Sequence, residues 1–129
     1  MSDSDDELER IQEAKREQLR AAGERSDPIR IETRAQFEEL VRSRDVVLVD
    51  FYADWCGPCK LLEPTVETLA RESPATVLKV DVDEHQAIAS EYQVQGVPTL
   101  YLFVDGEPRE RMVGVQDEAT LSNTIAQYA

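Results

Sequence analysis

The sequence is poor in cysteine, histidine and lysine, and it has no long run of apolar residues. Its 129 residues include two cysteines, one histidine and three lysines. No apolar stretch approaches the ~18 residues that a membrane-spanning helix needs, so we expect no membrane segment. The N-terminus is acidic, whereas a secretory signal begins basic and then becomes apolar, and we therefore expect a cytoplasmic protein. Two cysteines in a reducing compartment do not make a structural disulfide framework.

Positive charge is also scarce. The sequence has 14 basic and 27 acidic residues, which gives a net charge of −13. Such a field repels phosphate backbones, so we expect no binding of nucleic acid. Two interpretations of the acidity stay open. A lysine-poor acidic surface suits a salt-rich cytoplasm, where screening weakens the repulsion between like charges, but an ordinary acidic protein has the same composition.

The chain does have the length and apolar content of one domain with a core. Its hydrophobic fraction of 41% is typical of a globular protein, and 129 residues suit a single domain with an appendage. The composition changes near Asp27-Pro28, a dipeptide that breaks regular structure. We therefore divide the chain into an extension, residues 1–27, and a compact domain, residues 28–129.

The extension is predicted to form a charged helix over residues 5–22. Ser4 and Glu7 have the spacing of a capping box, and opposite charges recur three residues apart. The helix is expected either to be solvated and frayed or to dock onto a partner or a second copy. Its thin apolar stripe consists of Leu8, Ile11, Leu19 and Ala22.

The domain alternates between strand and helix patterns. Residues 46–52 form a nearly continuous apolar run rich in β-branched residues, which is typical of a central strand covered on both faces. Asp105-Gly106 predicts the tight turn of a hairpin. Helical segments separate the earlier strands, and one follows the hairpin. This order implies an α/β fold with a central mixed β-sheet flanked by helices on both faces. The expected strands are residues 29–31, 46–52, 76–82, 99–104 and 109–113.

Capping residues mark three of the expected helix starts. Thr33 and Gln36 have the capping-box pattern, and Asp117 or Gln116 is expected to begin the last helix. Asp83 is expected to cap a short helix. That short helix is expected to hold Ala87, Ile88 and Tyr92.

Cys56 and Cys59 are separated by Gly57 and Pro58, between the central strand and a helix. A structural disulfide here would close a loop of four residues, which the chain-entropy model values at only about 2 kcal/mol. A zinc site needs four ligands, and the one other candidate is His85, so one chain cannot complete it and we expect no metal. A redox pair needs only the two cysteines, and we favour it.

Redox chemistry suits this spacing. The first cysteine, Cys56, is expected at a helix N-terminus, where free N–H groups and the helix dipole stabilise a thiolate. Cys59 then lies about one turn further on, close enough to attack a mixed disulfide on Cys56. Holding the second thiol in place makes resolution an intramolecular step. Pro58 takes an early helical position, where its missing N–H costs little.

These residues resemble the thioredoxin family. Trp55-Cys56-Gly57-Pro58-Cys59-Lys60 matches its active-site signature, and Asp50 stands six residues before Cys56, like the family's buried aspartate. Gly96-Val97-Pro98-Thr99 resembles the loop that carries the family's cis-proline, and Gly114 also fits. The resemblance covers about residues 28–129 and implies the thioredoxin fold.

The resemblance also implies roles for three residues of the site. Cys56 would be the attacking thiol, Cys59 the buried resolving thiol, and Asp50 the carboxylate that takes or relays the proton of Cys59. Burial in an apolar strand raises the pKa of a carboxyl group, which suits a base near neutrality. The alternative is that Asp50 is merely paired with Lys79, which occupies the family's neighbouring lysine position.

A substrate groove beside the cysteines follows from the same resemblance. A backbone segment next to Pro98 would pair with an extended substrate strand. The alternatives are a simple strand-edge turn at Pro98 and core packing for Trp55. His85 is expected to be a surface residue near a helix start. The groove would be lined by Trp55, Gly96, Val97, Pro98 and Gly114, and supported by Gly57, Pro58 and Lys79.

The implied activity is that of a protein-disulfide reductase working by dithiol–disulfide exchange. It would act on disulfide-containing substrate proteins as a monomer without a cofactor, and a thioredoxin reductase would recharge it. The alternative is a thioredoxin-like partner-binding or folding-aid module that docks through its N-terminal helix. Tyr52 departs from the family pattern, because many members carry a second tryptophan there.

Overall fold

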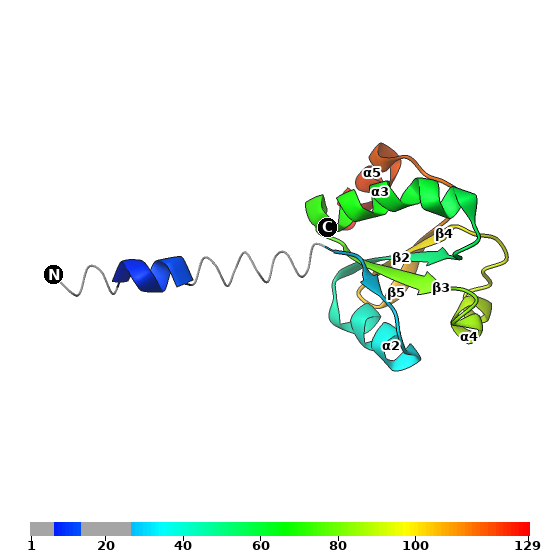
Figure 1. Cartoon of the computed structure of the whole chain (residues 1–129), viewed down its shortest axis with the longest axis horizontal. Helices are drawn as coiled ribbons and strands as arrows, with labels where there is room; N and C mark the ends of the chain where they lie inside the picture. Colours follow the sequence, from blue (N-terminus) through cyan, green and yellow to red (C-terminus); the bar gives the residue numbers. More distant parts are fainter. Residues whose placement is uncertain (1–6, 14–26) are drawn as a thin grey trace.

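The computed structural model describes residues 7–13 and 27–129. Residues 7–13 are helical, and the remaining elements belong to the domain (Figure 1). These elements are β1 (Ile29–Arg30), α2 (Arg34–Ser43), β2 (Val46–Tyr52), α3 (Gly57–Glu72), β3 (Thr76–Asp81), α4 (Gln86–Glu91), β4 (Thr99–Val104), β5 (Glu107–Val113) and α5 (Glu118–Ala126).

The strands of the domain form one mixed sheet in the order β1-β3-β2-β4-β5. Strand β2 is central: it pairs parallel with β3 and antiparallel with β4. All seven of its residues are buried. Helices α3 and α5 cover one face of the sheet, and α2 and α4 lie against the other (Figure 1). The expected central mixed sheet with helices on both faces is confirmed.

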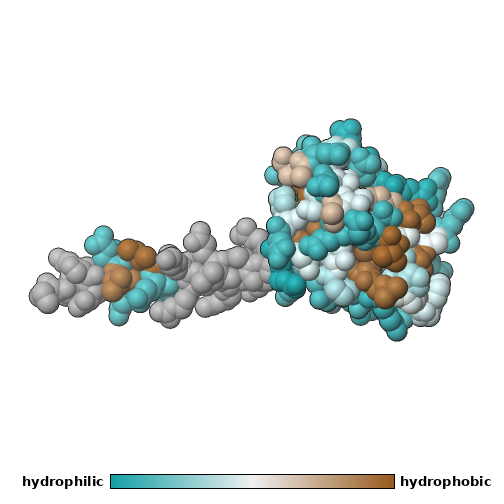
Figure 2. Space-filling view, turned by 90° about the horizontal axis from the view of Figure 1, so that it is seen from above, coloured by the Kyte–Doolittle hydropathy of each residue, from teal (hydrophilic) through white to brown (hydrophobic). Residues whose placement is uncertain are grey.

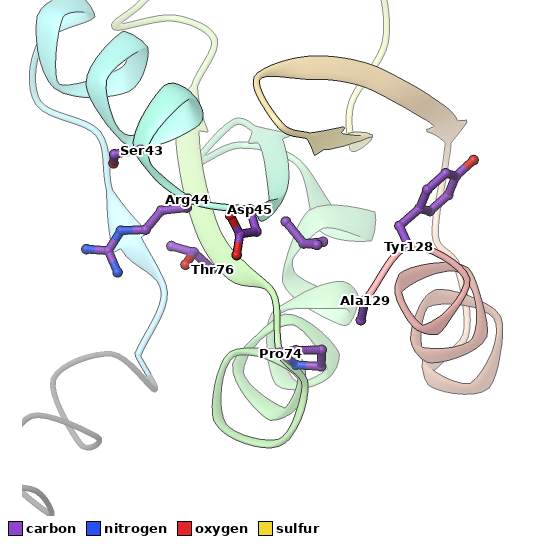
Figure 3. A pocket seen from close by; sticks show the side chains of 8 residues that line it. Ser43, Arg44, Asp45, Pro74, Thr76, Tyr128 and Ala129 are labelled. Atoms are coloured by element: carbon purple, nitrogen blue, oxygen red, sulfur yellow. The ribbon is translucent and has the colours of Figure 1, made fainter.

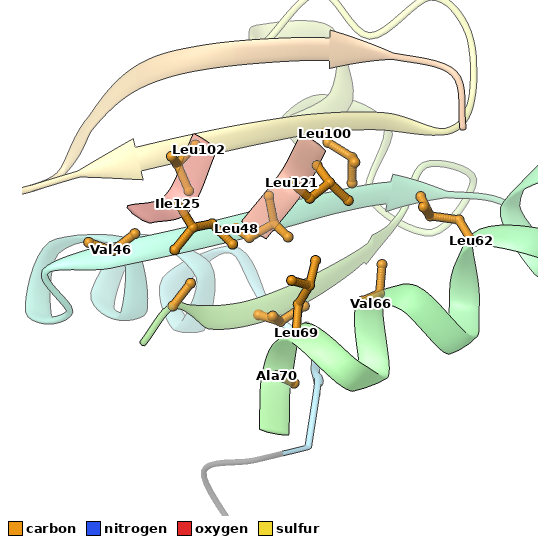
Figure 4. Packing of buried hydrophobic residues seen from close by; sticks show 12 residues of the cluster. Val46, Leu48, Leu62, Val66, Leu69, Ala70, Leu100, Leu102, Leu121 and Ile125 are labelled. Atoms are coloured by element: carbon orange, nitrogen blue, oxygen red, sulfur yellow. The ribbon is translucent and has the colours of Figure 1, made fainter. Parts of the chain in front are cut away.

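Alternate residues of β2 enter two separate cores, because successive side chains of a strand point to opposite faces. Val46 and Leu48 pack with residues of α3 and α5, including Leu62 and Leu121 (Figure 4). Val47, Val49 and Phe51 pack instead with residues of α2 and α4. The same alternation directs Asp50 to the α3 face of the sheet.

Two predicted helix caps are confirmed. Thr33 Oγ1 accepts the Gln36 N–H at 3.1 Å, and Asp117 Oδ1 accepts the Thr120 N–H at 2.7 Å. The capping box at α2 differs in one detail. Gln36 Oε1 accepts the N–H of Glu32, at 2.6 Å, rather than that of the capping residue. The side chain therefore satisfies the backbone one residue before the cap.

The predicted start of α4 is wrong. The helix begins at Gln86, and Asp83 does not cap it. Asp81 at the end of β3 takes the local N–H groups instead, because its Oδ1 accepts from Asp83 at 2.9 Å and from Glu84 at 3.3 Å. The helix holds Ala87 and Ile88 as expected, and Tyr92 is the residue that caps its C-terminus. Its buried residues are Ile88 and Ala89.

The hairpin between β4 and β5 has the predicted tight turn. Asp105 and Gly106 both have positive φ, 52° and 84°. This left-handed backbone is costly for most side chains and free of strain for glycine. The turn therefore depends on the Asp-Gly pair that predicted it.

Only part of the predicted N-terminal helix falls within the described residues. Residues 7–13 are helical, as predicted, and Leu8 and Ile11 are both exposed. The rest of the predicted segment, including the Ser4 cap, lies outside the described ranges. A docking role for the extension, and its boundary with the domain at residue 28, stay predictions. No helix within the described residues is long and apolar enough to cross a membrane.

Candidate active site

Cys56 is the residue that caps α3 at its N-terminus. Its Sγ accepts the Cys59 N–H at 3.1 Å, and the two cysteines are joined in a disulfide with Cα atoms 5.3 Å apart. Both side chains are 4% exposed. After reduction, a thiolate on Cys56 would sit where N–H donation and the helix dipole both stabilise negative charge. The predicted position of Cys56 at a helix N-terminus is confirmed.

The loop before β4 lies against the cysteine pair. Cys56 Sγ is 3.6 Å from the Val97 carbonyl oxygen, and the Val97–Pro98 peptide bond is cis, as the resemblance implies. Gly114 N–H donates to the Pro98 carbonyl at 2.8 Å, which joins the end of β5 to this loop. Within the loop, Thr99 Oγ1 donates to the Gly96 carbonyl at 2.6 Å. The structure therefore brings the predicted groove residues of both segments to one place.

Trp55 lies on the surface beside the disulfide. Its side chain is 71% exposed, so core packing is excluded as its role. Its Nε1–H donates to Asp83 Oδ2 at 2.9 Å, which ties the indole to the turn that follows β3. Hydrophobic side chains gather in one area of the surface seen in Figure 2, while hydrophilic ones cover much of the rest. The large apolar residues of the domain that are exposed are Trp55, Leu61, Val113 and Val115.

Asp50 is a buried carboxyl group in the middle of the central strand. It is 1% exposed, and its Oδ1 has no hydrogen-bond partner among the described residues. Burial raises the pKa of Asp50 from 3.8 to about 7, because the carboxylate loses its hydration; Lys79 lowers this pKa and Glu63 raises it. The expected direction of the pKa shift thus agrees with the structure.

Lys79 is the neighbour of Asp50 on β3, but its ion pair is with another residue. The two are opposite each other in the parallel register of β2 and β3. Lys79 Nζ lies 3.3 Å from Glu63 Oε1 on α3 and 4.4 Å from the centre of the Tyr52 ring. Among the described residues, no ion pair joins Lys79 to Asp50. The alternative that Asp50 is simply the ion-pair partner of Lys79 therefore does not describe this structure.

Other candidate sites lie apart from this chemistry. In residues 7–13 and 27–129, no three His, Cys, Asp or Glu side chains are placed to hold a metal ion. His85 precedes α4 as expected, but it is half-buried, with Nε2 2.9 Å from the Ile31 carbonyl. A hollow of about 480 Å³ lies at the start of β2 and β3, at the opposite end of β2 from Cys56 (Figure 3). It is lined by Ser43, Arg44, Asp45, Val46, Pro74, Thr76, Tyr128 and Ala129.

Comparison with known proteins identifies the family. A family model described as Thioredoxin matches residues 28–127. The chain belongs to the thioredoxin family. A thioredoxin from Chlamydia trachomatis is 43% identical over 101 residues, which cover 78% of this chain and 98% of that relative. A thioredoxin from Staphylococcus aureus is 44% identical over 98 residues, covering 74% of this chain and 93% of the relative.

The thioredoxin fold is confirmed by solved structures. A mutant thioredoxin from Halobacterium salinarum is 53% identical, with a TM-score of 0.79, and the match covers 81% of this chain and 92% of that one. The protein is thus a thiol–disulfide oxidoreductase, a protein-disulfide reductase with Cys56 and Cys59 as its redox pair. Membership of the thioredoxin family also implies substrate proteins and a thioredoxin reductase as partners.

Sequence reasoning missed two residues that shape the site of this thioredoxin-family member. Glu63 forms an ion pair with Lys79, and Asp83 accepts a hydrogen bond from the Trp55 indole. Glu63 lies four residues after Cys59, a spacing that places both on one face of a helix. Asp83 follows β3 as Trp55 follows β2, and the carboxyl ends of adjacent parallel strands meet at one edge of a sheet. Both spacings can be seen in the sequence, but they identify Glu63 and Asp83 as partners only once the fold is known.

Proposed function

We propose that Cys56 is the nucleophile and Cys59 the resolving thiol in the reduction of protein disulfides. The Cys56 thiolate attacks one sulfur of a substrate disulfide, forms a mixed disulfide and releases the other substrate sulfur as a thiol. Cys59 then attacks Cys56 Sγ, releases the second substrate thiol and leaves the Cys56–Cys59 disulfide. Two electrons and two protons pass to the substrate. The observation that most supports this proposal is the position of Cys56 Sγ at the N-terminal cap of α3, where it accepts a hydrogen bond from the Cys59 N–H.

Asp50 is the group that takes the proton of Cys59 in this scheme. A general base works best when its pKa lies near the working pH. The pKa of Asp50, raised to about 7 by burial, meets that condition. Its unpartnered Oδ1 on the α3 side of the sheet further supports the assignment, because a carboxylate already hydrogen-bonded would be a weaker proton acceptor.

The substrate binds across Trp55, the loop Gly96-Val97-Pro98 and Gly114. Exposed apolar surface at Trp55 supports this, and so does the Val97 carbonyl beside the disulfide, where an extended substrate segment would find a backbone partner. A Cβ atom built at Gly57, Gly96 or Gly114 would meet nothing within 4 Å, so these glycines border open space. The exposed residues Gly57 and Pro58 leave the approach to Cys56 uncrowded. Lys79 supports the site by lowering the pKa of Asp50.

The proposed setting is the cytoplasm, where a thioredoxin reductase returns the disulfide to the dithiol and the protein acts as a monomer. Joining both cysteines in one exchangeable pair suits a reducing compartment, in which structural disulfides do not persist. The reaction belongs to the domain from residue 28 onward, and residues 1–27 are an appendage to it.

Covalent trapping tests these roles. The Cys59→Ser variant should accumulate a mixed disulfide between Cys56 and a disulfide substrate such as insulin. Its turnover should fall by about 100-fold or more, because release then depends on an intermolecular thiol. Non-reducing electrophoresis and mass spectrometry detect the adduct, and a small thiol should dissolve it.

The matched control is Cys56→Ser, which should form no adduct and show no activity. An adduct on Cys59 in that control would reverse the assigned roles. A parent that reduces insulin while Cys59→Ser traps nothing would contradict the two-step scheme.

A further inference from the structure

The position of Lys79 is unexpected for a lysine next to a buried carboxyl group. Strand register places Lys79 directly beside Asp50, and both side chains point to the α3 face of the sheet. An unopposed ammonium group there would approach the carboxylate and stabilise its charged form. Its Nζ instead lies 3.3 Å from Glu63 Oε1, and the Tyr52 ring lies beneath it at 4.4 Å.

We propose that Glu63 is a positioning residue for the proton transfer assigned to Asp50: it holds the Lys79 ammonium group away from the Asp50 carboxyl group. The inference rests on the proposed function of Asp50 as proton acceptor for Cys59. Glu63 itself contacts neither substrate nor the reacting sulfur atoms in this role. It acts on Asp50 in two ways: it binds the Lys79 ammonium group, and its own carboxylate repels that of Asp50.

Few other charged groups lie close enough to Asp50 to shift its pKa. The charged groups that act on Asp50 are Lys79 on β3 and Glu63 on α3. The Tyr52 ring lies against Lys79, and Cys59, the proton donor of the proposed scheme, packs with Tyr52. The residue opposite Asp50 on β4 is the apolar Leu100, which belongs to one core cluster with Leu121 of α5. The balance of charge around Asp50 is therefore set mainly by one cation and one anion.

Their exposure explains why Lys79 prefers Glu63. The Glu63 side chain is 49% exposed and that of Lys79 only 19%, while Asp50 is 1% exposed. A pair at the edge of the core keeps part of its hydration, whereas a pair with Asp50 would bury both charges and lose that hydration. Glu63 thus keeps the pKa of Asp50 high in two ways: it repels the Asp50 carboxylate, and it binds the Lys79 ammonium group in an ion pair. Both effects act in the same direction on the pKa of Asp50.

The direct test is the titration of Asp50 in the oxidised protein, where neither cysteine ionises. Carbon-13 NMR of the Asp50 carboxyl group should follow its protonation with pH. In Glu63→Gln, the midpoint should move to lower pH by roughly half a pH unit, the size expected of a partly exposed ion pair. Glu63→Asp keeps the negative charge and should stay closer to the parent.

A matched control separates positioning from general charge. Glu67→Gln removes the same charge from an exposed residue one turn further along α3, and it should leave the midpoint in place. A second arm uses Lys79→Met, in which Glu63→Gln should move the midpoint less than in the parent, because only direct repulsion remains. An equal displacement in both backgrounds would overturn the claim that Glu63 acts through Lys79.

The inference is also overturned if Glu63→Gln titrates like the parent, or if Glu67→Gln moves the midpoint equally far. The pH profile of disulfide reduction distinguishes this failure from failure of the proposed function. If Asp50 titrates at lower pH in Glu63→Gln while the rate profile stays unchanged, the positioning by Glu63 stands and the proton role of Asp50 fails. If both profiles move together, both claims are supported.

Discussion

The two faces of the central sheet share the same strands but bury different chemistry. On the α2 and α4 face, five aromatic rings meet largely edge to face, with centroids 5.5 to 6.3 Å apart. These rings are Phe37, Phe51, Tyr92, Tyr101 and Phe103. On the α3 and α5 face the clustered core residues are aliphatic, the same face holds the buried Asp50, and the cysteine pair is buried with Tyr52 and Ala53.

One face of the sheet therefore contributes mainly to stability and the other to reactivity. Edge-to-face aromatic packing adds to the free energy of unfolding without introducing charge. A buried carboxyl group with an unpartnered oxygen does the opposite, because it must either lose hydration or keep a proton. Neighbouring residues of one strand, Asp50 and Phe51, thus serve opposite purposes because their side chains point to opposite faces.

The largest expected effect is a stability gain on the reactive face. Asp50→Asn should raise the free energy of unfolding at pH 8 by about 2–4 kcal/mol. The pKa of Asp50 is raised from 3.8 to about 7 on folding. Well below pH 4 the carboxyl group is protonated in both states, and its burial then carries no cost of keeping a proton. As the pH rises toward 7, only the unfolded chain ionises freely, so the parent loses stability relative to the variant.

Urea unfolding of the oxidised protein at pH 4 and pH 8 measures this effect. The difference between Asp50→Asn and the parent should be small at pH 4 and large at pH 8. Asp45→Asn, at an exposed position just before β2, is the control and should show little difference at either pH. If Asp50→Asn were no more stable than the parent at pH 8, the burial cost assigned to Asp50 would be wrong.

A smaller effect is expected on the aromatic face. Phe37 is 2% exposed and contacts the rings of Tyr92 and Phe103. Phe37→Leu should lower the free energy of unfolding by about 1–2 kcal/mol, because it loses ring contacts and leaves a small cavity. The same urea experiment should give equal losses at pH 4 and pH 8, with unchanged activity below the melting temperature. A loss that depended on pH would mean that the two faces are not independent.

Local patterns sufficed to predict much of the fold. The apolar run of β2, the caps Thr33 and Asp117 and the turn at Asp105-Gly106 depend on residues close together in the sequence. The failure at Asp83 also has a local cause. Asp81, two residues earlier, forms a turn before α4: its side chain accepts the N–H groups of Asp83 and Glu84, and its carbonyl accepts the His85 N–H that a cap at Asp83 could have used.

The site was predictable only in part, because its charges meet across the fold. Motif spacing located Asp50, the cysteines and the loop with Pro98. The partner of Lys79 could not be predicted, since Glu63 and Asp50 both lie within its range and their different burial decides between them. The bond from Trp55 to Asp83 likewise joins residues 28 positions apart.

The central claim is that Asp50 takes the proton of Cys59 when the mixed disulfide is resolved. A chromophoric thiol such as thionitrobenzoate can be loaded onto Cys56, and stopped-flow absorbance then follows its release by Cys59 across pH. We predict that the parent rate changes with a midpoint near pH 7, the pKa of Asp50. In Asp50→Asn this midpoint should disappear and the rate at neutral pH should fall at least about tenfold. Release at the parental rate, with the parental midpoint, would contradict the account.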